Sequence, residues 1–335
     1  MRRPTRIAVI GRQRAVVALI EELEINGIAD HTTVGWIATD RCVVPAFPCP
    51  QALGDIGQLA SVVREHRIDL LLLGSDVPRL AVFDELVRSR NQCAVRVCDL
   101  TAFYEDLFGH IPVSEINSTW FQYIMHPRFR ATTSNTKRIF DLVVATLLGI
   151  GVLPLLALAA ALIKLDGGPV LYRQQRIGEQ GRAFWMYKLR TMRHGDEDHA
   201  QVWCADGDPR VTRVGRVLRN LHIDELPQLY NVLRGDMSIV GPRPEQPQIS
   251  ARLEAQLPFY SRRHLIRPGL TGWAQVRCGY AGSERGSAWK LSHDLYYLKH
   301  QSLAYDISIL LRTLAILTPH RRTSPLRDAP FVTRS

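Results

Sequence analysis

Two adjacent carboxylates, Asp224 and Glu225, lie in the stretch "HIDELPQLYNVLRGDMSIVGPRP" (222–244). Carboxylate oxygens, together with water and phosphate oxygens, are ligands that Mg²⁺ prefers, and a carboxylate can also act as a nucleophile toward phosphorus. Guanidinium groups bind phosphate oxygens in a bidentate manner. Four arginines flank the pair in sequence: Arg216, Arg219, Arg234 and Arg243. These residue types together predict a site for phosphorylated substrates.

A purely structural interpretation of the same residues is also open. Asp224 suits the N-cap of a short helix, "ELPQLYNVLR", that would end at Gly235. Pro227 would fall in the first turn, where a missing amide donor costs little, and Glu225 would complement the helix dipole. This interpretation leaves the surrounding arginines unexplained.

Length and charge distribution indicate how the chain is organised. Its 335 residues predict two domains, and 46% hydrophobic residues are enough for a folded core. Residues 1–135 carry 14 Lys/Arg and 15 Asp/Glu, a net charge of −1, whereas residues 136–335 carry 28 and 17, a net charge of +11. The basic half therefore suits an anionic partner: nucleic acid, anionic lipid or a phosphorylated substrate.

The cysteines and the N-terminus exclude two classes of protein. The six cysteines form no C-x-x-C pair, so we expect reduced thiols rather than a disulfide framework or a metal cluster. The start, "MRRPTRIAVIG", is basic, but its apolar run is too short for a signal peptide.

The longest uncharged run, "LVVATLLGIGVLPLLALAAALI", covers 22 residues from Leu142 to Ile163. A helix needs roughly 20 apolar residues to cross a bilayer. Pro154 interrupts the run and would kink a helix, and basic residues flank both ends (Lys137, Arg138 and Lys164). Because basic flanks favour the cytoplasmic side, we expect a re-entrant segment with both ends there. A straight span and a buried core helix are the alternatives.

The elements before this run predict a parallel α/β sheet. Apolar strands are expected at 6–11, 33–40, 68–75 and 94–100, with helices between them. Gly11 stands alone where a dinucleotide-binding loop would need G-x-G-x-x-G. Asp40 could hold a ribose, but an ordinary loop at the end of the strand is the favoured interpretation. We therefore predict a Rossmann-like domain without an evident dinucleotide site.

The elements after the run are of mixed type. "VLYRQQRIG" and "AFWMYKLRTM" alternate apolar and polar residues, which predicts a small hairpin over 170–192. A helix is expected over 287–301. The segment 303–317 is too short and too charged to cross a membrane, so it could lie along a membrane surface or pack in the core.

The second half of the chain closely resembles the bacterial sugar transferases of the monotopic phosphoglycosyl transferase superfamily. The matching stretches include "GGPVLYRQQRIG" (167–178), "DPRVTRVGRVLR" (208–219), "IDELPQLYNVLRGDMSIVGPRP" (223–244) and "RPGLTGWAQV" (267–276), within 137–317. The first half resembles the Rossmann-like module that precedes the catalytic part in larger members. "GHIPVSEINSTWF" (109–121) looks like the junction of the exopolysaccharide-associated subgroup.

The resemblance implies transfer of a sugar-1-phosphate from a UDP-sugar to undecaprenyl phosphate, with release of UMP, at the start of exopolysaccharide or O-antigen repeat units. Asp224 would be the nucleophile that forms a phosphosugar-aspartyl intermediate. Glu225 would assist as a base and share Mg²⁺ with Asp224. Pro154 would be the membrane helix break. The residues that would hold phosphates are Lys188, Arg190, Arg219 and Arg243.

The fold implied is α/β: an N-terminal Rossmann-like parallel sheet domain followed by an α+β membrane-associated catalytic domain with a re-entrant helix. The expected divisions are a Rossmann-like domain (1–125) whose regulatory role is left open, a linker (126–136), the transferase domain (137–318, membrane hairpin about 139–164) and a basic tail (319–335). We expect one membrane-inserted segment, on the cytoplasmic face of the bacterial inner membrane. The expected partners are the UDP-sugar, undecaprenyl phosphate and membrane lipids, without nucleic acid, and a homodimer is left open.

Two departures from the family pattern bear on these expectations. The helix break is usually Ser-Pro, whereas here it is Leu153-Pro154, and "RCGYAGS" (277–283) replaces the usual continuation after "AQV". The rival functions are a non-catalytic, membrane-docked regulator that senses a nucleotide-sugar, and a metal-dependent lipid phosphatase or hydrolase that uses the same carboxylates. The uncharged run 142–163 argues against a nucleic-acid-binding protein.

Overall fold

The computed structural model describes residues 3–39, 51–88, 95–116, 120, 135–165, 167–193, 208–278 and 284–317. The chain forms two compact units that divide between residues 123 and 124. Asp40, most of the expected linker 126–136 and the expected tail 319–335 lie outside the described residues.

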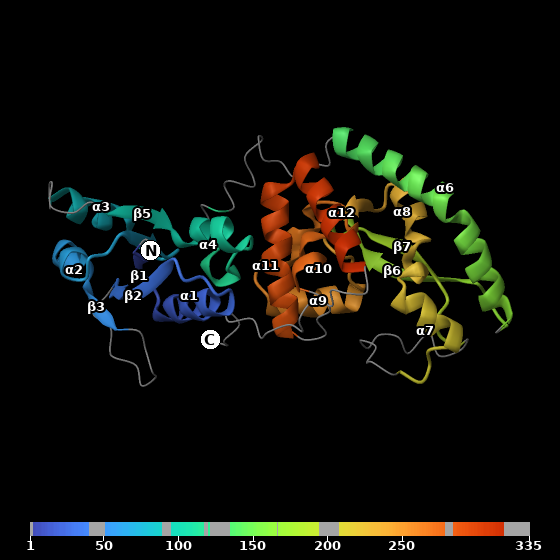
Figure 1. Ribbon diagram of the computed structural model, residues 1–335, viewed down its shortest axis with the longest axis horizontal. Coiled ribbons are helices and arrows are strands. Elements are labelled where there is room, and N and C mark those ends of the chain that lie inside the picture. Colours follow the sequence, from blue (N-terminus) through green and yellow to red (C-terminus); the bar gives the residue numbers. More distant parts are fainter. Residues whose placement is uncertain are drawn as a thin grey trace. The chain divides into compact units, whose positions relative to one another are not determined.

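The first unit is built on five parallel strands in the order β3-β2-β1-β4-β5 (Figure 1). The strands are β1 (Thr5–Ile10), β2 (His31–Ala38), β3 (Ala52–Asp55), β4 (Leu70–Leu73) and β5 (Arg96–Asp99). The connecting elements are α1 (Gln13–Ile25), the 3-10 turn η1 (Ile56–Gln58), α2 (Leu59–Glu65), α3 (Arg79–Arg88), α4 (Leu100–Phe108) and η2 (Val113–Glu115). The predicted parallel sheet is confirmed, and β3 is an additional edge strand.

Both faces of this sheet are covered, which explains its continuous apolar strands. Successive residues of a strand point to opposite faces. Ile7 and Val9 of β1 accordingly join a cluster with α1 and α4, whereas Ala8 and Ile10 join a second cluster with α2.

The second unit combines one long helix with short helices and two small sheets. It begins with α6 (Asn135–Leu165), the antiparallel hairpin β6 (Leu171–Ile177) and β7 (Ala183–Leu189), and the 3-10 turn η4 (Glu179–Gly181) between its strands. The middle part is α7 (Arg213–Asn220), η6 (Ile223–Glu225), α8 (Gln228–Arg234) and β8 (Ser238–Val240). The last part is α9 (Pro247–Gln256), η7 (Tyr260–Leu265), β9 (Gly269–Thr271), α10 (Trp273–Cys278), α11 (Glu284–His300) and α12 (Leu303–Leu317). The predicted hairpin is confirmed, and β8 pairs with β9 in parallel.

Helix α6 is a single bowed helix of 31 residues that continues through Pro154 (Figure 1). In the described part of the chain it is the one helix long and apolar enough to cross a membrane, with a mean hydropathy of 2.6 over its most apolar 18 residues. Only 11% of its most apolar window is buried. Large apolar side chains stand exposed along it, among them Ile139, Val143, Leu147, Ile150, Leu153 and Leu158. A two-armed hairpin is not seen, and the re-entrant mode stays a prediction.

Helix α12 has two distinct sides. Asp306 and Ile309 are fully buried, whereas Leu303, Ile307, Leu311 and Leu314 are exposed. These four residues follow the three- and four-residue spacing of one helix face. The exposed apolar face fits the predicted position along a membrane surface better than the alternative of a core helix.

Candidate active site

The acid pair lies on the 3-10 turn η6 and does not cap a helix. His222 precedes the turn in the left-handed region (φ 55°), and Pro227 occupies the cap position of α8. The interpretation of Asp224 as an N-cap is therefore wrong, because the chain makes a separate turn before α8 begins. With three residues per turn in a 3-10 helix, consecutive side chains point about 120° apart. Asp224 and Glu225 consequently face different surroundings.

Glu225 joins two cations that come from distant parts of the chain. Lys188 Nζ, on β7, donates to Glu225 Oε1 at 2.7 Å. Arg243, after β8, donates from Nη2 to Oε1 at 2.6 Å and from Nη1 to Oε2 at 3.3 Å. Three of the residues predicted for the site are thus brought together by direct contacts.

Asp224 is buried, yet its carboxylate remains available. Among the residues that the structure describes, none forms a hydrogen bond or an ion pair with this carboxylate. Burial raises its pKa and the neighbouring Glu225 adds to the rise, whereas Lys188 and Arg219 oppose it. Asp224 is therefore free to meet a ligand, in contrast to Glu225.

The two carboxylates also differ in their ionisation. Burial alone would raise the pKa of Glu225, but Arg243 and Lys188 hold it well below its usual range. Burial lowers the pKa of Lys188, and Glu225 counteracts part of that effect. The attraction of Glu225 raises the pKa of Arg243 further. Glu225 is therefore the fixed anion that holds two cations beside Asp224.

The other two predicted phosphate-binding residues contact different groups. Arg219, on α7, donates from Nε to Thr191 Oγ1 at 2.8 Å and is close enough to influence the pKa of Asp224. Arg190 is buried and donates from Nη2 to the carbonyl of Ile163 at 3.2 Å, near the C-terminal end of α6. Cationic side chains commonly bind such terminal carbonyls. The described contacts of Arg190 do not bring it to the acid pair.

The C-terminal half of α6 supports the site. Ala159 and Ile163 of α6 form a buried cluster with Leu189 and Leu218, against which Ile223 packs. Leu189 follows Lys188, and Ile223 precedes Asp224. Pro154 precedes these residues in α6 and belongs to no described contact of the acid pair. The long apolar helix thus holds the strand and the turn that carry the site.

Residues 132–319 match the family model for bacterial sugar transferases. The chain belongs to the bacterial sugar transferase family. A UDP-glucose:undecaprenyl-phosphate glucose-1-phosphate transferase of Caulobacter vibrioides is 48% identical over 238 residues, which are 68% of this chain and 89% of that protein. An exopolysaccharide production protein of Rhizobium leguminosarum is 40% identical over 185 residues, 53% of this chain and 92% of that protein.

A longer family member matches over part of its length only. The UDP-N-acetylgalactosamine-undecaprenyl-phosphate N-acetylgalactosaminephosphotransferase of Aeromonas hydrophila is 49% identical over 167 residues. That match covers 49% of this chain and 40% of the relative. The match thus spans less than half of the Aeromonas protein, whereas it spans most of the Caulobacter protein.

The acid pair supplies part of a ligand set for a Mg²⁺ ion. Within the described ranges, no group of three or more His, Cys, Asp and Glu side chains is arranged to hold a metal. Asp224 offers an unbonded carboxylate, whereas both oxygens of Glu225 already accept hydrogen bonds. Since Mg²⁺ often binds through one or two carboxylates together with substrate phosphates and water, these residues fit an ion that is completed by a phosphate ligand.

Among the described residues, carboxylates lie near the place in the sheet of the first unit where nucleotides usually bind. In open α/β sheets that place lies outside the carboxyl ends of the strands, where the strand order reverses, here at β1 and β4. Gly11 and Asp76 lie there, and Arg12 pairs with Asp76 at 3.3 Å. Buried Glu115 accepts a hydrogen bond from the Ser75 amide at 2.9 Å. Carboxylates in this position disfavour a phosphate.

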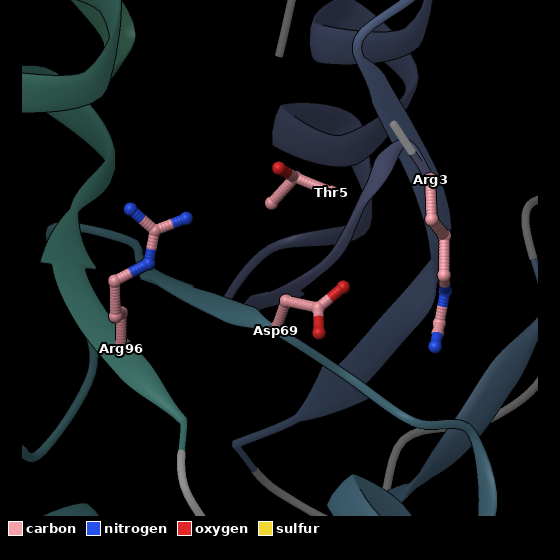
Figure 2. Close-up of a pocket in the computed structure, with 4 residues that line it drawn as sticks. All are labelled: Arg3, Thr5, Asp69 and Arg96. Atoms are coloured by element: carbon pink, nitrogen blue, oxygen red, sulfur yellow. The ribbon is translucent and has the colours of Figure 1, made fainter. Parts of the chain in front are cut away.

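A surface hollow lies at the opposite, amino-terminal ends of the strands of the same sheet. Figure 2 shows its lining side chains: Arg3, Thr5, Asp69 and Arg96. Thr5 and Arg96 begin their strands, so the hollow lies at the amino ends, and Asp69 already accepts a hydrogen bond from the Arg6 amide at 2.9 Å. Its position gives no reason to assign a nucleotide to it.

The contacts also show supporting residues that the sequence interpretation missed. Arg138 donates to the carbonyls of Val232 and Leu233, at 2.7 and 2.9 Å, and so ties α6 to the end of α8. Arg263 contacts the loop that carries Arg243. Their sequence surroundings resemble those of the other arginines in this basic half, so no local pattern singles them out.

Proposed function

We propose that the protein transfers a sugar-1-phosphate from a UDP-sugar to undecaprenyl phosphate and releases UMP. The observation that carries the proposal is the contrast within the acid pair: Asp224 is unbonded, while Glu225 holds Lys188 and Arg243 beside it. The relatives from Caulobacter and Aeromonas, whose names state such transfers, support the choice of donor and acceptor. The exposed apolar helix α6 fits an acceptor that resides in a membrane.

The proposed first step is an attack on the donor. An Asp224 carboxylate oxygen attacks the phosphorus that bears the sugar, and the bond from this phosphorus to the bridging oxygen breaks. UMP leaves with that electron pair, and the sugar phosphate remains on Asp224 as an acyl phosphate. In the second step a phosphate oxygen of the lipid attacks the same phosphorus. The bond to Asp224 breaks, which regenerates the carboxylate and gives the lipid-linked product.

The cations would stabilise the negative charge of the phosphates. Lys188 and Arg243 are held by Glu225, and Arg219 lies near Asp224, so the three can contact donor oxygens without a large rearrangement. We propose that orienting these cations is the main contribution of Glu225, since as a base it would first have to loosen those contacts. Mg²⁺, held by Asp224, Glu225 and the diphosphate, would neutralise further charge. For Arg190 we keep phosphate binding as a proposal that requires it to leave the α6 carbonyl.

The apolar surface supports a membrane location. We propose that α6 enters the inner membrane from the cytoplasmic face and returns to it, with Pro154 as the bend, and that α12 lies along the lipid surface. Pro154 cannot donate to the carbonyl of Ile150, which weakens the helix at that point. We further propose that the reaction starts repeat-unit synthesis for an exopolysaccharide or O-antigen, and the homodimer stays open.

The decisive experiment incubates the purified protein in detergent with radiolabelled UDP-sugars, Mg²⁺ and undecaprenyl phosphate. We expect UMP release together with a labelled lipid product. Asp224→Asn should abolish both while leaving the thermal unfolding profile in place. Substantial turnover by this variant would refute the role of Asp224 as nucleophile. Sugar phosphate released into water without lipid acceptor would instead identify a hydrolase, and absence of turnover with every UDP-sugar would favour the regulator.

A further inference from the structure

A buried cluster lies beneath the loop that carries Arg243. Arg263 of η7 is 4% exposed, Asp294 of α11 is 2% exposed, and their side chains pair at 2.8 Å. Arg263 Nη1 also donates to the hydroxyl of Tyr260 at 2.7 Å. The cluster contains an ion pair that is removed from water, which costs several kcal/mol of desolvation per ion.

This cluster contacts the main chain of Arg243. Arg263 Nη2 donates to the Arg243 carbonyl at 2.9 Å. Within the described ranges, Arg263 is the residue that satisfies this carbonyl. The flanking prolines, Pro242 and Pro244, have no amide hydrogens and restrict the backbone on both sides of Arg243. Arg263 therefore fixes the main chain of Arg243 through the Arg243 carbonyl.

Neighbouring contacts hold the ends of the loop between β8 and α9 (241–246), but not its centre at Arg243. The amide of Gly269 donates to the Pro242 carbonyl, and the amide of Ile177 donates to the Glu245 carbonyl, both at 2.9 Å. Arg176 Nη1 reaches the Pro244 carbonyl at 3.3 Å. The centre, at Arg243, depends on Arg263. A shift there would move the guanidinium that contacts Glu225 at 2.6 Å.

We propose that Arg263 is a positioning residue for the transfer reaction, and that Asp294 holds Arg263 in place. The inference rests on the proposed function, because Arg243 is assigned there to phosphate binding. The planar guanidinium group of Arg263 makes three contacts at once. Its Nη2 forms the ion pair with Asp294 and donates to the Arg243 carbonyl, while its Nη1 donates to the Tyr260 hydroxyl. A lysine has the same charge but cannot make these contacts in the same directions. A buried ion pair is weak support for stability, which is a reason to look for its effect on geometry.

The test uses the full-length protein in detergent and compares Arg263→Lys with the double variant Arg263→Met/Asp294→Leu. The double variant removes both buried charges, and such apolar replacements often leave stability unchanged or improved. We expect kcat/KM for the UDP-sugar to fall about 100-fold in both, the size associated with a misplacement of about 1 Å. We also expect most of that loss to appear as a higher KM for the UDP-sugar rather than as a lower kcat, because Arg243 is assigned to binding the donor phosphates.

Glu22→Gln provides a matched control. It disrupts another buried pair, Glu22 with His110 at 2.6 Å, which belongs to the first unit and not to the unit that carries the loop. We expect it to lower the thermal unfolding temperature while leaving the KM for the UDP-sugar unchanged. Wild-type kcat/KM and a wild-type KM in the folded double variant would overturn the inference, while the loss caused by Asp224→Asn would still stand.

A structure of Arg263→Lys gives a readout that does not depend on turnover. We expect the contact between Arg243 and Glu225 to lengthen beyond hydrogen-bond distance. A retained contact of the present length would contradict the inference even if no UDP-sugar proved to be a substrate.

Discussion

Glu225→Gln tests the central electrostatic arrangement of the site. The substitution keeps the side-chain shape but removes the carboxylate that Lys188 and Arg243 share. Three hydrogen bonds depend on it, of 2.7 Å from Lys188 and of 2.6 and 3.3 Å from Arg243. Each of these bonds joins ionised partners, which makes it stronger than a bond between neutral groups.

The expected loss of stability follows from the burial of the three side chains. Breaking a buried ion pair costs about 3–5 kcal/mol. The side chains of Glu225 and Lys188 are 15% and 19% exposed, but that of Arg243 is 37% exposed, so solvent screens part of its attraction. We therefore take the lower end, about 3 kcal/mol. For a unit of this size such a loss lowers the unfolding temperature by about 6–12 °C.

The pH dependence provides a second signature. Because Arg243 and Lys188 outweigh burial, the pKa of folded Glu225 lies well below its usual range. Its contribution to stability is therefore complete above the unfolded-state pKa of about 4.3 and is lost as the pH falls through the folded-state pKa. The difference between the wild type and Glu225→Gln should be constant from neutral pH to about pH 5 and shrink at lower pH.

Thermal unfolding in detergent, followed at a series of pH values, measures both effects. Glu245→Gln is the matched control: it makes the same chemical change in the same loop, where the Glu245 carboxylate lies 3.8 Å from Arg176, beyond hydrogen-bond distance. We expect that control to shift stability by less than Glu225→Gln does, because attraction between charges weakens with distance. Equal shifts for the two variants, or a Glu225→Gln difference that does not depend on pH, would show that the reasoning about the shared carboxylate is wrong.

The remaining predictions concern ionisation, the membrane and α6. Burial raises the pKa of Asp224, and only its ionised form attacks phosphorus. As the pH is lowered, formation of the phosphosugar intermediate should therefore decline at a higher pH than for an ordinary aspartate. A pH series of UMP release measures this decline. Leu147→Lys, on the exposed face of α6, should weaken membrane association by about 3 kcal/mol in vesicle flotation, and unchanged flotation would contradict burial of that face in lipid. Single cysteines at 135 and 165, in a cysteine-free background, should both react from the cytoplasmic side, and labelling from opposite sides would indicate a span. Arg190→Met should raise the KM for the UDP-sugar if Arg190 binds a phosphate as proposed, whereas a lower unfolding temperature with an unchanged KM would leave Arg190 as a structural contact of α6.

The sequence predicted the elements of this protein better than the contacts within its site. Apolar runs revealed β1 and β4, and alternation revealed the hairpin β6–β7, because both patterns are local. The strand β3, "ALGD", was missed because it is short, lies at the edge of the sheet and has no apolar run. Its existence depends on pairing with β2.

The site was predicted in part. A motif resemblance could mark Lys188, Glu225 and Arg243, but their ion pairs depend on how β7, η6 and the loop after β8 meet. Local pattern also misassigned Asp224 as a helix cap, because the choice between a cap and a separate 3-10 turn is made by packing of Ile223 against α6 and its neighbours. Arg263 could not be found in advance, since its partners are 20 and 31 residues away and only the fold brings them together.

The packing of Ala159 and Ile163 against Leu189 and Leu218 has a mechanical consequence. It joins α6 and the Asp224 carboxylate into one body, so with α6 inserted in the membrane as proposed, the depth of its insertion sets the height of this carboxylate above the lipid. Bilayers with shorter or longer acyl chains should then change how readily a phosphate headgroup reaches Asp224, although no atom of the pocket itself is altered. Lipid thickness would thereby act as a control on the second half-reaction and leave the first, with its water-soluble donor, almost untouched.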